Sequence, residues 1–146
     1  MHSSKLEYLG LVAAARSFVN EVSDKNNVNI EFREHGVPRN LPQEVALSLF
    51  RILQQALHNA VEHSGTSKIE VRLWEHSNEV HLTVKDSGQG FDLSAIQGAG
   101  LGLTSMRERA RLVNGSIDID SRPKGGTTIH VSVPFDSEVV SQRQAV

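Results

Sequence analysis

The sequence predicts an α+β fold in which helices cover one face of a largely antiparallel β-sheet. Every segment with strand character alternates apolar and polar residues instead of running apolar throughout, which is typical of a sheet with one covered and one solvated face. Three other segments carry apolar residues at helical spacing, and helices of this kind can cover the apolar face. The expected architecture is therefore a two-layer α/β sandwich.

Three helices are predicted from apolar residues that recur three and four positions apart. They span about residues 5–24, 42–63 and 103–113. Pro42 suits the first turn of the second helix, because its missing N–H would have no intrahelical partner there. Asn114 and Gly115 are typical of a helix C-cap, so they mark the end of the third helix.

Five strands are predicted from the alternation of apolar and polar residues. They lie near residues 28–32, 69–73, 80–84, 117–119 and 129–133. The polar run His76-Ser77-Asn78 predicts a tight turn between the second and third strands. Residues 86–100 contain several glycines and little periodicity, which predicts a loop. The polar residues 136–146 predict a flexible C-terminal tail.

The composition fits one domain. A chain of 146 residues, 38% apolar and 22% charged, is long enough to bury a core. The net charge of −2, without a local run of Lys or Arg, predicts no nucleic-acid partner. Cysteine is absent, which excludes disulfides and zinc–thiolate sites. We expect the histidines in predicted loops or on solvated strand faces to be solvated, because they share no ligand spacing: His35, His76, His81 and His130.

The second helix carries a polar stripe on an otherwise apolar segment. Gln55, Asn59, Glu62 and His63 fall three and four positions apart, so their side chains stack along one side of the helix. The other sides of this helix are apolar and are expected to pack on the sheet and on neighbouring helices. The stripe must therefore face a cleft or the surface.

Three glycine-containing segments lie where elements begin or end. Residues 86–91, DSGQGF, follow a predicted strand and place a carboxylate beside backbone that a ligand can approach closely. Residues 98–102, GAGLG, open a helix, where free amides and the helix dipole attract phosphate. Residues 125–128, GGTT, enter the last strand with two hydroxyl groups. Together with the polar stripe, these segments predict a nucleotide site.

In this order, QQALHNAVEHS, DSGQGF, GAGLGLTSMRERA and GGTT resemble four sequence boxes, called N, G1, G2 and G3. These boxes belong to the ATP-binding domain shared by sensor histidine kinases, DNA gyrase, a heat-shock chaperone and mismatch-repair ATPases, the GHKL superfamily. GLGLTSMRERA most resembles two-component histidine kinases paired with LuxR-type response regulators. The resemblance covers roughly residues 41–134. It implies the Bergerat fold, with a mixed, mostly antiparallel sheet and helices packed on one face.

The resemblance also implies a division of the chain. Residues 1–27 would be a connecting helix, the remnant of a dimerisation region, and residues 28–135 the ATP-binding kinase domain. Residues 136–146 would be the flexible tail. A cytoplasmic location is expected, because the sequence shows no signal-peptide pattern and no apolar run of membrane-spanning length. A longer protein containing this chain could still be attached to a membrane.

The adenine end of the site is assigned from the resemblance. Asp86 would hydrogen-bond the adenine amino group, and Thr127 would assist through a water molecule. Gly88 and Gly90 would shape the adenine pocket.

The phosphate end is assigned in the same way. Asn59 would hold Mg²⁺ against the phosphates, because phosphoryl transfer depends on neutralising and positioning their oxygens. Gly100, Leu101 and Gly102 would meet the phosphates under a lid formed by about residues 91–99. His63 is assigned to the phosphates from its position one helical turn beyond Asn59.

Two positions depart from the family pattern. Gln55 stands at the position of a Glu taken to act as catalytic base, and an amide cannot take a proton. Glu62 stands where Lys or Arg is usual near the phosphates, and a carboxylate there would repel them unless it faces solvent. The acceptor histidine of the family has no counterpart in this chain, so we expect it on a dimerisation domain absent from the chain.

The leading hypothesis is the ATP-binding domain of a sensor histidine kinase. It would use Mg-ATP to phosphorylate a histidine on the dimerisation domain of a homodimeric full-length protein, for relay to a LuxR-type response regulator. One alternative, motivated by Gln55 and Glu62, is a nucleotide-binding regulatory module with weak or no kinase activity. Another is a serine kinase acting on an anti-sigma regulator, which shares the four boxes.

Overall fold

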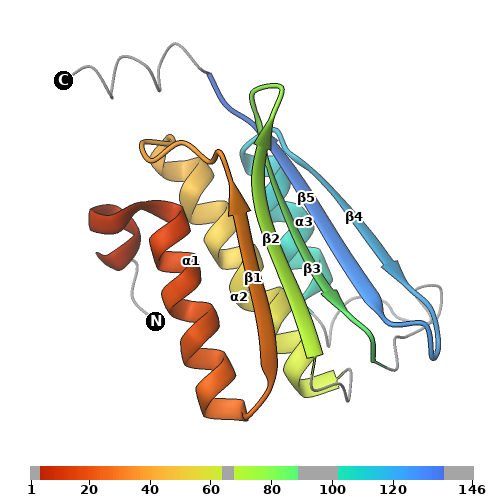
Figure 1. The fold of residues 1–146 in the computed structure, drawn as a ribbon. Helices are drawn as coiled ribbons and strands as arrows, with labels where there is room; N and C mark the ends of the chain where they lie inside the picture. The colour runs from red at the N-terminus through yellow and green to blue at the C-terminus, as the bar shows by residue number, and fades with distance from the viewer. Residues whose placement is uncertain (1–3, 64–67, 89–101, 137–146) are drawn as a thin grey trace.

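A computed structural model describes residues 4–63, 68–88 and 102–136, and the three helices and five strands in this part of the chain agree with those predicted (Figure 1). In chain order they are α1 (Ser4–Asn26), β1 (Asn29–His35), α2 (Gln43–His63), β2 (Lys68–His76), β3 (Glu79–Asp86), α3 (Leu103–Leu112), β4 (Ser116–Ser121) and β5 (Thr127–Pro134). The predicted α+β class is confirmed. No helix within these described ranges is both long and apolar enough to cross a bilayer.

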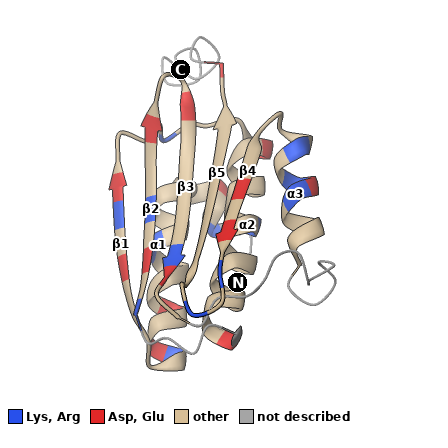
Figure 2. Ribbon diagram, turned by 90° about the vertical axis from the view of Figure 1, so that its right-hand side faces the viewer, with Lys and Arg blue, Asp and Glu red and all other residues tan. Residues whose placement is uncertain are grey.

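The strands form one sheet in the order β1-β2-β3-β5-β4. β1 and β2 are parallel, because the chain between them passes through α2 and returns to the same end of the sheet. The other neighbouring pairs are antiparallel. The sheet is therefore mixed and mostly antiparallel, as predicted, and Figures 1 and 2 show the three helices on one side of it.

The core lies between α2 and the sheet. Leu49, Phe50 and Leu57 of α2 are fully buried, as are Val71 and Leu82 on the covered face of the sheet. Burial of one such side chain contributes about 1.5–3 kcal/mol, so this layer is the main source of stability. α2 is apolar on most sides because it contacts α1, α3 and the sheet.

The first helix is bent at Gly10. This residue has φ 84° and ψ 172°, a backbone conformation that favours glycine. A side chain there would also crowd the backbone oxygen of Arg39, 3.2 Å from the expected Cβ position. The sequence predicted one continuous helix, because helical periodicity does not register a single residue of reversed φ. After the bend, α1 packs against α2 and β1.

Two connections have the geometry that their residues predicted. The β2–β3 turn has positive φ at both Ser77 and Asn78, which matches the right-handed twist of a two-residue hairpin. At the end of α3, the amide of Gly115 donates to the oxygen of Ala110 at 2.8 Å, with Asn114 at φ 57°. This bond is characteristic of a Schellman motif, so the predicted C-cap is confirmed.

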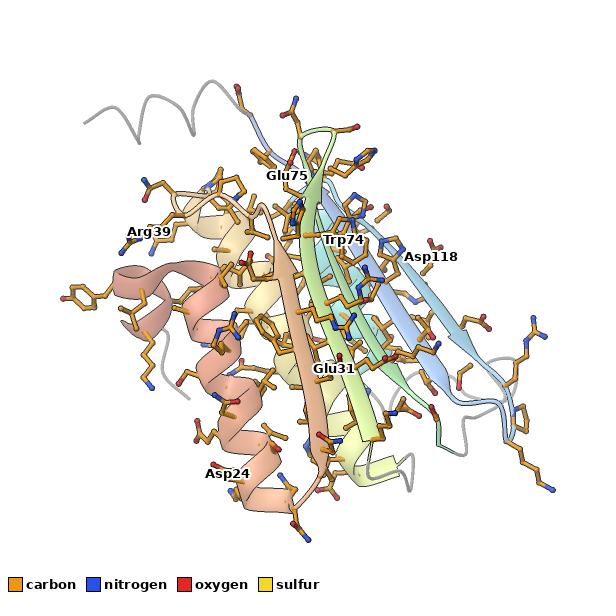
Figure 3. All side chains as sticks on the ribbon, viewed as in Figure 1. Asp24, Glu31, Arg39, Trp74, Glu75 and Asp118 are labelled. Atoms are coloured by element: carbon orange, nitrogen blue, oxygen red, sulfur yellow. The ribbon has the colours of Figure 1, made fainter. Side chains whose placement is uncertain are left out.

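An aromatic cluster lies on the open face of the sheet. The rings of Trp74, labelled in Figure 3, and His81 stack with centroids 5.0 Å apart. His81 Nδ1 lies 3.1 Å from His130 Nε2, and the His81 side chain is only 14% exposed. The expectation of a solvated His81 is therefore wrong, because β3 and β5 bring together histidines that are distant in sequence. Burial and the neighbouring His130 lower the pKa of His81.

Candidate nucleotide-binding site

The polar stripe of α2 divides into residues with different environments. Asn59 is 7% exposed and buried within the protein. Gln55, one turn earlier, is half-buried, and its Nε2 donates to Asn59 Oδ1 at 3.1 Å. Glu62 is exposed to solvent. A carboxylate at this position would repel phosphate only if it faced the site, so its exposure removes the conflict. The side chain of His63 lies outside the described residues.

Asp86 is a buried carboxylate at the end of β3. It is 6% exposed and its Oδ1 accepts a hydrogen bond from the amide of Gly88 at 2.9 Å. Burial raises the pKa of Asp86, while hydrogen bonds from the backbone of Gly88 and Thr127 act in the opposite direction. These amides orient the carboxyl group, which retains further lone pairs to accept a hydrogen bond from an amino group of a ligand.

The strand register brings the two predicted adenine-side residues together. Asp86 of β3 lies directly opposite Thr127 of β5. Asp86 also lies opposite Ile69, which is fully buried on the helix-covered face of the sheet. Directly opposite residues point to the same face, so the Asp86 side chain lies in the layer that also contains α2.

Ser121 is a polar residue of this site that the sequence analysis missed. It is 7% exposed, and its hydroxyl lies 2.7 Å from Thr127 Oγ1. The two residues are register partners at the turn end of the β4–β5 hairpin, next to the loop of residues 122–126. The alternation of apolar and polar residues did not give this pair, because the register of the two strands depends on the geometry of the loop 122–126 between them.

Gly126 permits the close approach of β5 to β3. Its φ is 77°, and a side-chain carbon at this position would collide with the backbone oxygen of Asp86. A residue larger than glycine would therefore displace the strand end that carries the carboxylate. This is the structural reason for glycine in the GGTT segment.

The start of α3 lies against the polar stripe of α2. Gly102 is the N-cap of α3 with φ 66°, and among the described residues no side chain caps this end of the helix. A Cβ at Gly102 would lie 2.6 Å from Cδ of Gln55. The first amides of an α-helix have no intrahelical acceptor, so this juxtaposition places free helix amides beside Gln55, whose partner is Asn59.

The described residues contain no group of three or more His, Cys, Asp or Glu that could hold a metal ion by itself. They do fit Mg²⁺ bound together with phosphate, which needs fewer protein ligands. Mg²⁺ in phosphate-binding sites is commonly held by one or two protein oxygens, with phosphates and water completing its octahedron. The side-chain oxygen of Asn59 can serve as such a ligand. The predicted Gly90, Gly100 and Leu101 lie outside the described residues, as does the predicted lid.

Comparison with protein families identifies the class. Residues 44–137 match the family described as "Histidine kinase-, DNA gyrase B-, and HSP90-like ATPase", and the chain belongs to this family. The resemblance read from the four boxes is thus confirmed. Within the family, the chain is an ATP-binding catalytic domain of the histidine kinase type.

The curated relatives include three named histidine kinases. The chain is 31% identical over 133 residues to the histidine-protein kinase/phosphatase DegS of Brevibacillus brevis, covering 91% of this chain and 34% of DegS. It is 33% identical over 136 residues to the oxygen sensor histidine kinase NreB of Staphylococcus carnosus, covering 92% and 39%. For the sensor histidine kinase MctS of Rhizobium johnstonii, identity is 32% over 143 residues, covering 96% and 31%. The chain therefore spans about a third of the length of these relatives.

Solved structures support the same fold at lower identity. The blue-light-activated histidine kinase of Erythrobacter litoralis superposes with a TM-score of 0.74 at 17% identity, over 93% of this chain and 43% of the other. The catalytic domain of the histidine kinase ThkA superposes with a TM-score of 0.67 at 19% identity, over 88% and 92%. The predicted fold class is confirmed.

Proposed function

We propose that this domain transfers the terminal phosphoryl group of Mg-ATP to a histidine on a dimerisation domain, for relay to a LuxR-type response regulator. The relatives support this, because the three described above are named histidine kinases. The observation that carries the proposal is the convergence of Gln55, Asn59 and the uncapped start of α3 in the layer that holds the buried Asp86.

The larger protein in this proposal is a homodimer, with residues 1–27 as the connecting helix and residues 28–135 as the kinase domain. We place the domain in the cytoplasm, where ATP is available. The regulatory-module and anti-sigma alternatives are less well supported, because neither agrees with the names of the relatives.

Asp86 selects adenine in this mechanism. Its carboxylate accepts a hydrogen bond from the exocyclic amino group, and the backbone amides that already bind it fix its orientation. A base that presents a carbonyl at this place would put two acceptors face to face, which is unfavourable. The hydroxyl pair of Ser121 and Thr127 supplies a polar edge at which water can bridge to the base.

Asn59, Gln55 and the start of α3 act on the phosphates. The amides of α3 bind phosphate oxygens, and Mg²⁺ held by Asn59 would neutralise phosphate charge. The hydrogen bond from Gln55 fixes the orientation of the Asn59 amide. Because Gln55 cannot accept a proton, we assign it this positioning role and place any general base on the acceptor domain.

The proposal is tested in a chimera in which this chain replaces the corresponding domain of NreB. After incubation with ATP labelled on its terminal phosphate, we expect acid-labile label on the acceptor histidine of the chimera, with unmodified NreB as the positive control. The same chimera carrying Asn59→Ala should retain almost no label. If the chimera binds ATP but stays unlabelled while NreB is labelled, the chain is a nucleotide-binding regulatory module.

A further inference from the structure

A small cavity lies between α2 and α3, next to the phosphate end of the nucleotide site. Its volume is about 210 Å³, and its lining consists of Arg51, Gln54, Gln55, Ser105, Met106 and Arg109. Figure 2 shows α2 and α3 side by side, with basic residues along α3. Gln55 lines the cavity and also donates to Asn59. Only the Gln55 side chain therefore separates a group in the cavity from Asn59 of the proposed phosphate site.

The cavity is positively charged and carries no compensating carboxylate. Arg51 and Arg109 are its charged lining residues, and both are half-buried. Across the described ranges, neither guanidinium has a carboxylate within salt-bridge distance. Arg111 on the same α3 differs, because it is paired with Glu108 at 2.7 Å. Two unpaired cations in one partly enclosed space attract an anion, and burial reduces the screening by salt.

The remaining lining residues favour an oxyanion as the ligand. Arg51 Nη1 donates to Gln54 Oε1 at 2.8 Å, which uses one of five guanidinium donors and orients the rest of the group. Ser105 can also donate, and Met106 is buried and forms an apolar wall. A cavity of 210 Å³ is smaller than the roughly 300–1,000 Å³ typical of sites for whole small molecules. It suits a single carboxylate or phosphoryl group.

We propose that this cavity, the α2–α3 pocket, binds an acidic side chain of the segment that presents the acceptor histidine. This inference rests on the proposed function, since it assumes that a polypeptide approaches the terminal phosphate. A carboxylate held by Arg51 and Arg109 fixes that segment one side chain away from Gln55 and the start of α3. Arginine–carboxylate pairs suit this role because two parallel hydrogen bonds fix orientation as well as distance. The competing source of an oxyanion is the terminal phosphate of the nucleotide.

The first test measures oxyanion binding without any kinase reaction. The 146-residue chain, saturated with ADP so that the nucleotide site is filled, is titrated with inorganic phosphate and separately with acetate at constant ionic strength. Arginine Nε–Hε signals are followed by NMR and assigned with Arg51→Lys, Arg109→Lys and Arg111→Lys. We expect saturable shifts for Arg51 and Arg109 and none for Arg111. Equal, unsaturable shifts at all three would show that the pocket does not bind oxyanions.

The second test identifies the source of the oxyanion in the NreB chimera. Arg51→Gln combined with Arg109→Gln removes both positive charges while keeping polar side chains, and it should lower histidine phosphorylation at saturating ATP by ~10-fold or more. The affinity for ATP should stay unchanged, and Arg111→Gln should change neither quantity. Replacing the acidic residues of the acceptor segment one at a time by their amides should identify one that gives the same loss. The two losses should not add, because both remove the same interaction.

Each other outcome has a distinct meaning. A fall in ATP affinity equal to the fall in phosphorylation would assign the pocket to the nucleotide phosphate and overturn the acceptor assignment. Losses that add would also overturn it, because the arginines and the acidic residue would then act separately. If the chimera with the natural domain is never labelled, the proposed function fails, whereas the NMR titration still decides whether the pocket binds oxyanions.

Discussion

Replacing Asp86 by Asn should separate adenine recognition from stability. The substitution removes the charge of a side chain that is 6% exposed while keeping its shape and an oxygen for the amide of Gly88. A hydrogen bond to a charged group contributes about 1.5–3 kcal/mol. The affinity for ATP should therefore fall by roughly 10- to 150-fold, since about 1.4 kcal/mol corresponds to a factor of ten.

In Asp86→Asn the free energy of unfolding should rise or stay unchanged, whereas the affinity for ATP falls. The pKa of Asp86 is raised, chiefly by burial, so the native state binds a proton more readily than the unfolded chain. Its stabilising contribution is then fully present below the unfolded-state pKa and is lost as the pH rises through the higher folded-state pKa. At pH 7 the ionised carboxylate is a cost, which Asp86→Asn removes. The nucleotide-free variant should be at least as stable as the natural chain at pH 7.

Calorimetry of ATP binding and urea unfolding at pH 7 measure the two effects. Asp24→Asn, at an exposed acidic residue of α1 labelled in Figure 3, is the matched control and should change neither. Unchanged ATP affinity in Asp86→Asn would refute the adenine assignment. A clear loss of stability would refute the argument that burial of this charge is costly.

Three further predictions concern metal, backbone and pH. Asn59→Ala should reduce ATP affinity measured with Mg²⁺ to the value measured in EDTA; a Mg²⁺ enhancement that survives the substitution would contradict the metal assignment. Gly126→Ala should lower the free energy of unfolding, measured in urea, more than Gly36→Ala does. Both glycines have positive φ, which costs about 1–2 kcal/mol for a residue with a side chain, but only at Gly126 would the new Cβ collide with neighbouring backbone. The lowered pKa of His81 contributes stability that is present above about pH 6.5, the unfolded-state value, and is lost as the pH falls through the lower folded-state pKa. His81→Gln should flatten the decline in unfolding free energy between about pH 7 and 5, and an unchanged slope would show that another group causes it.

Much of the candidate site could be read from the sequence because its parts are local. Asp86 at a strand end, Gly102 at a helix start and Asn59 on a polar stripe each follow from a short segment and its periodicity. The order of the four segments identified the family. The contacts that make these parts one site were not local: Gln55 beside Gly102, and Ser121 beside Thr127 across a hairpin.

By itself, the sequence determined the helices and strands, the C-cap at Asn114 and the residues available to bind nucleotide, since periodicity and backbone preference act over a few residues. Only the tertiary structure decided the strand order β1-β2-β3-β5-β4, the bend at Gly10 and the contact between His81 and His130. It also decided that Arg51 and Arg109 share a cavity. The physical reason is that an apolar or polar pattern fixes which side of an element is buried, whereas packing selects the distant residues that meet it.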